Sequence, residues 1–231
     1  MKILHISDWH GDMSLDSGDS DIIVCSGDLL PNRSLGQRDR DSQVGKASLA
    51  AEKNYQTAWV LKNIEKFKSL IGAKPFLFCP GNHDFINPVP LLKDAGLNAI
   101  DLENKREEVL GFSFYGFPYI NYIVGEWQYE LIPTELAAKT QEIPLETIDV
   151  LVAHCPPYGF LDMAGGHKFG NSALSGRLYY GCEKWPRMIL CGHLHPSFGI
   201  IELPNGGERG HCIISNAATG ARMLELKKKA R

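Results

Sequence analysis

The chain lacks the features that mark membrane, secreted and nucleic-acid-binding proteins. None of its apolar runs approaches the ~18 residues of a membrane span, and MKILHIS enters a strand-like run at once, which argues against a signal peptide. The formal net charge is −3, so no basic field favours a long nucleic acid or a membrane as partner. Six cysteines form no CxxC pair, and most lie in or beside apolar runs. We therefore expect reduced thiols and a cytoplasmic location.

Repeats, low-complexity segments and linkers are also missing, so we expect a single domain over residues 1–231. Apolar residues make up 44% of the chain and charged residues 22%, which is typical of a soluble globular protein. A chain of this length can bury a substantial core. The apolar runs that would form such a core are short and numerous.

Eight of these runs are typical of buried strands, and they lie at residues 2–7, 21–27, 74–80, 112–118, 149–154, 187–193, 197–203 and 211–217. Between the second and third runs, apolar residues at i, i+4, i+7 and i+11 predict a helix over residues 49–71. Further helices are predicted to begin at Pro133 and to span residues 172–180. Helices alternate with strands early in the chain and strands predominate later. That order favours helices flanking two packed sheets.

Polar side chains follow five of the runs, at the point where each run ends. The endings read DWH, GD, GNHD, AH and GHLH. Ligands of open α/β sheets bind beyond the carboxyl ends of the strands. Alternation along an extended chain also sends both members of the pairs Asp8/His10 and His193/His195 to one side. The sequence thus predicts one cleft lined by oxygen and nitrogen ligands, which are Asp8, His10, Asp28, Asn82, His154, His193 and His195.

Seven such ligands exceed what one tetrahedral ion needs, and they suit two ions that share a carboxylate. No cysteine joins them, which argues against a soft thiolate site, and Mn, Fe, Zn, Co and Ni all suit the mixed ligands. A histidine outside such a pattern is more often a packing or surface residue, as we expect for His5 and His211. By contrast, His167 lies in a glycine-rich loop and could approach a substrate.

The series DWH, GD, GNHD, AH and GHLH resembles the calcineurin-like metallophosphoesterase superfamily over almost the whole chain. The resemblance implies a four-layer αββα sandwich, in which helices flank two mixed sheets, and a centre of two divalent metal ions. It implies one ligand set for each ion and one shared carboxylate: Asp8, His10 and His195 for the first ion, Asn82, His154 and His193 for the second, and Asp28 for both. In that family the residue at His83 faces the substrate and stabilises or protonates the departing oxygen. Asp84 either orients His83 or bonds to the amides of the loop.

The superfamily spans several substrates, and the motifs narrow the choice. Protein phosphatases extend the second motif as GDxVDRG, whereas this chain reads GDLLPNR, with Pro31 and Asn32 in place of Asp and Arg. The stretches AHCPPYGFLD and GHLHPSFG look like the small subfamily related to class III cyclic-nucleotide phosphodiesterases. That resemblance implies hydrolysis of a small nucleotide phosphodiester by a hydroxide that bridges two ions, with manganese among the candidates. A phosphomonoesterase and a catalytically silent binding protein of the same fold are the alternatives.

Two loops carry side chains suited to a nucleotide substrate. Residues 31–46 contain several arginines, and residues 156–181 contain aromatic rings and a histidine. Arginine can bind a phosphate through two parallel hydrogen bonds, and aromatic rings can stack on a base. Solvated loops with one or two buried aromatic rings would give the same pattern. The candidate substrate contacts are Arg33, Tyr158, Phe160 and His167.

Overall fold

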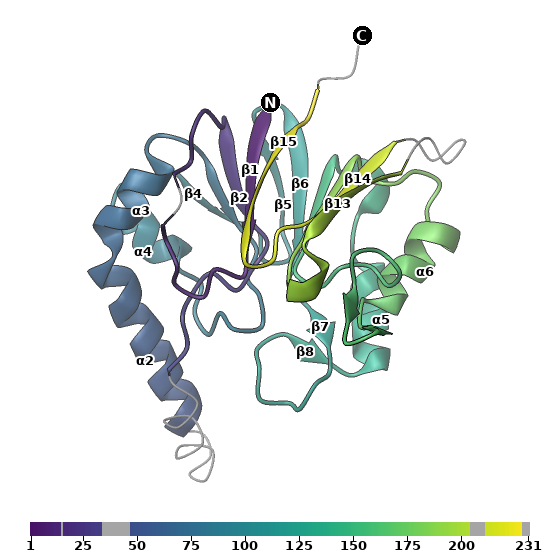
Figure 1. Ribbon diagram of the computed structural model, residues 1–231, viewed down its shortest axis with the longest axis horizontal. Coiled ribbons are helices and arrows are strands. Elements are labelled where there is room, and N and C mark those ends of the chain that lie inside the picture. Colours follow the sequence, from purple (N-terminus) through teal and green to yellow (C-terminus); the bar gives the residue numbers. More distant parts are fainter. Residues whose placement is uncertain (15, 34–46, 204–210, 228–231) are drawn as a thin grey trace.

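Two sheets face each other in the computed structural model, and helices cover their outer faces (Figure 1). The structure describes residues 1–14, 16–33, 47–203 and 211–227. Helices α2 (Ala47–Lys62), α3 (Ile64–Ile71) and α4 (Val89–Asp94) lie against one sheet. Helices α5 (Pro133–Gln141) and α6 (Ser172–Tyr180) lie against the other. The predicted class, a sandwich of two mixed sheets between helices, is confirmed.

The first sheet consists of β1 (Lys2–Ser7), β2 (Ile22–Cys25), β3 (Phe76–Phe78), β4 (Ala99–Asp101) and β15 (Gly220–Glu225). The strand order is β15-β1-β2-β3-β4. Strands β1 to β4 run parallel, and β15 pairs with β1 in the antiparallel sense. Because parallel strands all end at the same edge of a sheet, the residues that follow β1, β2 and β3 emerge side by side.

The second sheet consists of β5 (Arg106–Val109), β6 (Phe112–Phe117), β9 (Val150–Ala153), β12 (Met188–Cys191), β13 (Gly199–Leu203) and β14 (Cys212–Asn216). Its strand order is β13-β14-β12-β9-β6-β5. The four inner strands run parallel, whereas β5 and β13 are antiparallel edge strands. The residues after β9 and β12 therefore also emerge together.

Short elements shape the connections outside these two sheets. Strand β7 (Ile120–Asn121) pairs with β8 (Glu130–Leu131), and β10 (Met163–Ala164) pairs with β11 (His167–Lys168). Single 3-10 turns form at η1 (Leu145–Thr147) and η2 (His195–Ser197). The Asn121 side chain at the end of β7 donates to the carbonyl oxygen of Phe169 (2.8 Å), which follows β11. This bond joins the loop that contains β7 and β8 to the loop that contains β10 and β11.

Alternation along the strands fills both faces of each sheet with apolar side chains. In β1, Ile3 packs between the two sheets and Leu4 packs beneath the helices. In β9, Val150 packs between the sheets and Leu151 packs beneath α5 and α6. All four side chains are buried. Strands with two buried faces read as continuous apolar runs, which is why the sequence locates them.

The eight predicted strands are confirmed, as are the helix beginning at Pro133 and the helix over residues 172–180. The helix predicted over residues 49–71 is divided at Asn63 into α2 and α3. The Asn63 side chain donates to the Trp59 carbonyl oxygen (2.8 Å) and so competes with the helical hydrogen bonds. Sequence patterns missed α4, β4, β5 and β15. These elements are short or half exposed and carry no long apolar run.

All six cysteines are free, and five of them are buried. Burial raises the pKa of the Cys155 and Cys212 thiols to about 12, so neither is a good nucleophile near neutral pH. Over the described ranges, no helix combines the length and the apolar character that crossing a membrane requires. The cytoplasmic location stays a prediction.

A histidine joins the two sheets in the middle of the molecule. His5 in β1 is completely buried. One ring nitrogen lies 2.9 Å from the Ser26 hydroxyl of the first sheet, and the other lies 2.9 Å from the Ser215 hydroxyl in β14. Burial disfavours the imidazolium and lowers the pKa of His5 to about 3, although the carboxylate of Asp8 opposes the shift. The histidine is thus a packing residue, as the sequence indicated.

This neutral histidine makes the stability of the protein depend on pH. The unfolded chain takes up a proton below its pKa of about 6.5, whereas folded His5 stays neutral down to about pH 3. The contribution of His5 to the free energy of unfolding is therefore complete well above pH 6.5, and it is lost as the pH falls below that value. Between pH 7.5 and pH 5 it amounts to about 2 kcal/mol. In urea unfolding with a chelator present, the stability lost between pH 7.5 and pH 5 should be smaller in His5→Gln than in the wild type by about this amount. The exposed His211→Gln is the control, and an unchanged pH dependence in His5→Gln would contradict the assignment.

Candidate metal centre

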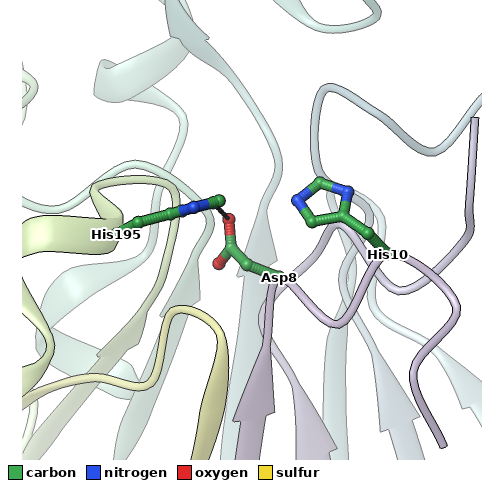
Figure 2. A group of neighbouring side chains, drawn as sticks. All are labelled: Asp8, His10 and His195. Carbon is green, nitrogen blue, oxygen red and sulfur yellow. Dashed lines mark hydrogen bonds and ion pairs between the residues drawn. The ribbon is translucent and has the colours of Figure 1, made fainter.

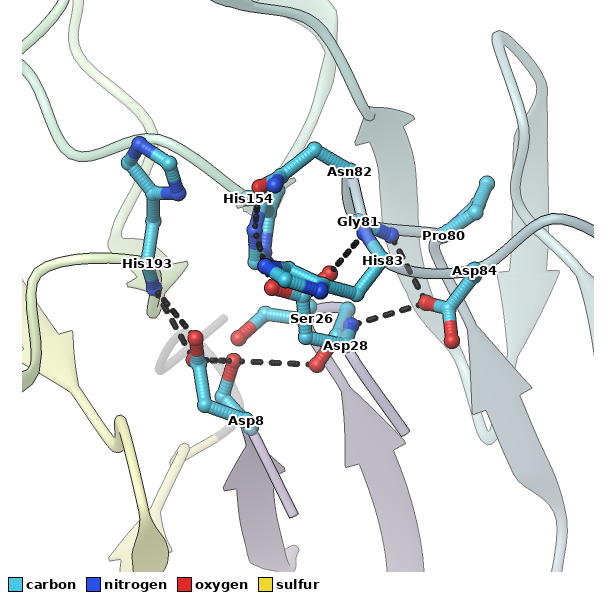
Figure 3. Close-up of polar contacts among 12 residues, drawn as sticks. Asp8, Ser26, Asp28, Pro80, Gly81, Asn82, His83, Asp84, His154 and His193 are labelled. Carbon is cyan, nitrogen blue, oxygen red and sulfur yellow. Dashed lines mark hydrogen bonds and ion pairs between the residues drawn. The ribbon is translucent and has the colours of Figure 1, made fainter. Parts of the chain in front are cut away.

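Side chains from both sheets meet where five strands end. Asp8 follows β1, Asp28 and Asn82 lie beyond β2 and β3, and His154 and His193 lie beyond β9 and β12. Figure 3 shows most of these side chains directed toward one another across the gap between the sheets. Six residues fall into two groups whose ligand atoms lie within 4.8 Å of one another in each group: Asp8, His10 and His195, and Asp28, His154 and His193. The seventh predicted ligand, Asn82, lies beside the second group, with its Oδ1 atom 3.0 Å from His154 Nε2, and the His193 amide links the two groups by donating to Asp8.

The first group is centred on the carboxylate of Asp8 (Figure 2). The Nε2 atom of His195 lies 3.1 Å from Asp8 Oδ1, and His10 approaches from the other side. The Ser7 hydroxyl donates to Asp8 Oδ2 (2.6 Å), and the backbone N–H of His193 donates to both oxygens (2.9 and 3.1 Å). Burial acts to raise the pKa of Asp8, but the bond to His195 and the other partners hold it below its usual range. Asp8 is therefore an oriented, ionised carboxylate.

In the second group, His154 faces acceptor atoms of Asp28 and of the neighbouring Asn82. His154 Nδ1 lies 2.8 Å from the Ser26 carbonyl oxygen, which can only accept, so this nitrogen carries a hydrogen. In the neutral ring Nε2 is then an acceptor. It faces Asn82 Oδ1 (3.0 Å) and Asp28 Oδ2 (3.3 Å), which are oxygen atoms that also accept.

Facing acceptors need a cation between them. Burial disfavours the charge on His154, but the Asp28 carboxylate outweighs burial and raises the pKa of His154 to about 9. A proton can therefore occupy the position, and so can a metal ion. The bond to Ser26 is the contact that commonly orients a metal-binding histidine. These oxygen and nitrogen atoms fit a divalent transition metal.

Several of these residues have an uncommon backbone conformation. The φ angles of Asp8, His10, Asp28 and His193 are 55°, 46°, 54° and 65°. The left-handed region disfavours residues that carry a Cβ atom, at roughly 1–3 kcal/mol each. Such strain persists where the surrounding structure enforces it, and it is concentrated at functional sites. Here it turns the chain sharply at the ends of β1, β2 and β12.

Gly192 allows the two sheets to approach each other at the site. A Cβ atom built at this position would lie 1.9 Å from Ser7 Oγ and 2.1 Å from Asp8 Oδ2. The backbone before His193 therefore packs directly on the Asp8 carboxylate. That close packing permits the two hydrogen bonds from the His193 amide described above.

The stretch PGNHDF is fixed by the carboxylate of Asp84. Its oxygens accept hydrogen bonds from the backbone N–H groups of Asp28 (2.7 Å), Leu30 (3.0 Å) and Gly81 (2.8 Å), as Figure 3 shows in part. Burial, together with repulsion from Asp28, raises the pKa of Asp84 to about 7. Of the two roles considered for Asp84, bonding to loop amides is the one the structure contains.

His83 lies beside the two groups and is held by several contacts. Its backbone N–H donates to Asp28 Oδ1 (2.7 Å). Its ring centroid lies 4.8 Å from that of His10 and 4.0 Å from that of Trp127. The ring atom Nδ1 is hydrogen-bonded to the side-chain oxygen of Asn32. Sequence patterns missed Trp127 entirely, whereas Asn32 was visible only as a departure from the protein-phosphatase motif.

The four predicted substrate contacts have different surroundings. Arg33 pairs with Glu52 of α2 (3.3 Å). Phe160 packs against the rings of Tyr179 and Trp185, with centroid distances of 6.0 and 6.1 Å. Tyr158 and His167 are exposed, and residues 34–46 of the first loop lie outside the described residues. The role of these four residues in substrate binding stays a prediction, and for Phe160 the packing contacts match the alternative of a buried aromatic ring.

The fold and the grouped ligands define a metallophosphoesterase. A family model described as calcineurin-like phosphoesterase matches residues 1–197, and the chain belongs to this family, whose members are metal-dependent phosphoester hydrolases. The human and mouse proteins named metallophosphoesterase domain-containing protein 1 are each 28% identical to it over 106 residues, which is 45% of this chain. The matched region spans 32% of those relatives, so it is about a third of their length.

A solved structure shares a more distant likeness. The 5'-nucleotidase precursor from Thermus thermophilus matches with a TM-score of 0.43 and 12% identity. The match covers 94% of this chain and 48% of the other.

The close packing at Gly192 can be tested by adding one methyl group. Gly192→Ala should lower the free energy of unfolding by about 1–3 kcal/mol, because the methyl group meets Ser7 and Asp8. Gly176→Ala adds the same group inside α6, where nothing lies within 4 Å, and should raise stability by about 0.5–1 kcal/mol. Urea unfolding in the presence of a chelator measures both. A Gly192→Ala protein as stable as the wild type would show that the two sheets are not packed this closely.

Proposed function

We propose that the protein is a binuclear metal-dependent phosphodiesterase that acts on a small nucleotide-type phosphodiester. The observation that carries the proposal is the pair of ligand groups, in each of which three Asp and His ligand atoms lie within 4.8 Å of one another. At His154, the facing oxygen atoms of Asn82 and Asp28 are acceptors and need a cation between them and the ring. A catalytically silent relative of this fold would have no need to keep every ligand and His83 as well.

The ligands divide between the two ions as the family resemblance implies. Each ion takes one group and the two share a carboxylate, so the assignment is Asp8, His10 and His195 for one ion, Asn82, His154 and His193 for the other, and Asp28 for both. When bound, two such ions lower the pKa of a water molecule into the neutral range and neutralise phosphate oxygens. The donor set suits Mn, Fe, Zn, Co or Ni.

The chain's own groups prepare the site for this chemistry. Ser26 fixes the tautomer of His154, and Asp84 holds the loop of Asn82 and His83 against the end of β2. His83 contributes the group that protonates the departing oxygen of the substrate. Its ring lies beside that of His10, which is one of the proposed metal ligands.

A small nucleotide diester is the substrate class that the motifs favour. The stretch AHCPPYGFLD and the motif GHLHPSFG support it through their resemblance to the small phosphodiesterase subfamily. A diester carries one negative charge and a monoester nearly two. Tyr158 is exposed and the ammonium group of Lys168 lies over its ring at 5.4 Å from the centroid, so an aromatic ring and a cation are present together for a base and a phosphate.

The shared carboxylate predicts that one substitution will weaken both ion sites. Asp28→Asn keeps the shape of the side chain and removes the charge between two cations, so purified protein should retain neither ion at wild-type affinity. Metal analysis after dialysis at defined manganese concentrations measures the loss. Asp162→Asn is the matched control, because Asp162 is equally buried but accepts from the amides of Gly159 and Gly170. Two ions retained by Asp28→Asn would refute the bridging assignment.

Substrate class is tested by comparing esters that differ in charge. With saturating manganese, the rate of hydrolysis of bis-nitrophenyl phosphate should exceed that of nitrophenyl phosphate by about tenfold or more. A tenfold ratio corresponds to about 1.4 kcal/mol, which is the size of one polar contact. Cyclic nucleotides, dinucleotides and nucleoside monophosphates extend the panel, each with several divalent metals. Faster turnover of monoesters would assign the protein as a phosphatase. No turnover of any ester with any metal would refute hydrolysis altogether.

A further inference from the structure

Asn32 binds one residue, His83, with both ends of its side-chain amide. The Nδ2 atom of Asn32 donates to the backbone carbonyl oxygen of His83 (3.1 Å). The Oδ1 atom of Asn32 is hydrogen-bonded to Nδ1 of the His83 ring. One side chain therefore fixes the backbone and the ring of the same histidine.

These two contacts determine which hydrogen atoms are present. A carbonyl oxygen can only accept, so the amino end of Asn32 must face the His83 backbone. The oxygen end then faces the ring, and an amide oxygen can also only accept. Nδ1 of His83 must therefore carry a hydrogen, which leaves Nε2 as the nitrogen that can exchange a proton with a reacting group.

We infer that Asn32 is a positioning residue that sets the tautomer and ring orientation of His83. The inference rests on the proposed function, in which His83 protonates the leaving oxygen, and it identifies a residue that makes this possible. Because Asn32 holds the hydrogen on Nδ1, proton transfer takes place at Nε2. The imidazolium form of His83 gives its Nε2 hydrogen to the leaving oxygen, and the neutral ring that remains is the Nδ1–H tautomer. Trp127 packs against the His83 ring at 4.0 Å between centroids, with the two ring planes tilted by 43°, and this contact limits rotation of the ring.

A neutral amide suits this position better than a carboxylate. An aspartate here could accept from Nδ1, but its second oxygen would face the His83 carbonyl and the two acceptors would repel. The amide satisfies both partners without adding a charge beside the cluster. That accounts for Asn32 in GDLLPNR in physical terms.

Gln56 of α2 provides an internal comparison because its hydrogen bonds hold backbone groups. Its amino group donates to the same His83 carbonyl oxygen (2.7 Å). Its oxygen accepts from the backbone N–H groups of Phe85 (2.7 Å) and Ile86 (3.3 Å). Loss of Gln56 should loosen the loop and leave the ring partner in place, whereas loss of Asn32 removes the ring partner.

The tautomer can be measured without any activity. Chelated protein labelled with ¹⁵N-histidine, at a pH above the ordinary histidine pKa, gives long-range ¹H–¹⁵N spectra that distinguish Nδ1–H from Nε2–H rings. A His83→Ala spectrum assigns the His83 signals. We expect Nδ1–H in the wild type, in Asn32→Asp and in Gln56→Ala, and a mixture of tautomers in Asn32→Ala. Asn32→Leu, which is close in shape, serves if Asn32→Ala does not fold.

The kinetic consequence depends on the leaving group. A ribose alkoxide needs a proton and nitrophenolate needs little help, so Asn32→Ala should lose about tenfold in kcat on a cyclic nucleotide and less than about twofold on bis-nitrophenyl phosphate. His83→Ala should lose ~10²–10⁴-fold on the nucleotide. Adding Asn32→Ala to His83→Ala should cause no further loss, because Asn32 acts through His83.

Three spectroscopic results would each overturn the inference. They are a wild-type His83 with its hydrogen on Nε2, an unchanged tautomer in Asn32→Ala, and a tautomer shift in Gln56→Ala as large as that in Asn32→Ala. Equal rate losses on both substrates would also contradict it. If the wild type hydrolyses no phosphoester at all, the proposed function fails, and the spectra still decide whether Asn32 sets the tautomer.

Discussion

The site depends on one buried carboxylate that connects two strand ends. Asp84 accepts hydrogen bonds from the amides of Asp28 and Leu30 after β2 and from the amide of Gly81 after β3. These amides lie where the strands have ended and sheet hydrogen bonds no longer serve them. The left-handed conformation of Asp28 needs this support. With the two turns joined, Asp28, Asn82 and His83 have fixed positions, and the residues of the second sheet can pack against them.

The strands and most of the ligand set could be predicted from sequence because both depend on local patterns. Strands buried on two faces are continuous apolar runs, and the polar residues that follow them stand out. Asp8, Asp28 and His154 belong to this class. The division of the long helix at Asn63 could not be predicted, because it depends on a choice between two hydrogen-bond partners for one amide. The edge strands β5 and β15 are half exposed and so lack an apolar pattern.

The supporting residues were beyond prediction for a different reason. Ser26, Asn32 and Gln56 are ordinary polar residues that acquire a role only through neighbours distant in sequence. The contact between Asn32 and His83 spans 51 positions, and that between Ser26 and His154 spans 128. No spacing rule relates such pairs. The loop residue Phe160 packs against Tyr179 and Trp185, and its role as a substrate contact stays a prediction.

The position of the ligands at the junction of the two sheets also bears on how the protein matures. Asp8 and His195 are 187 positions apart, so neither half of the chain contains a complete group. The sheets must dock before the ligand atoms approach one another, and loop closure over such a distance comes late in folding. A partly folded chain, or one still being synthesised, therefore has no competent site with which to capture a wrong ion. An ion bound by these groups would be held by residues of both sheets and would oppose their separation.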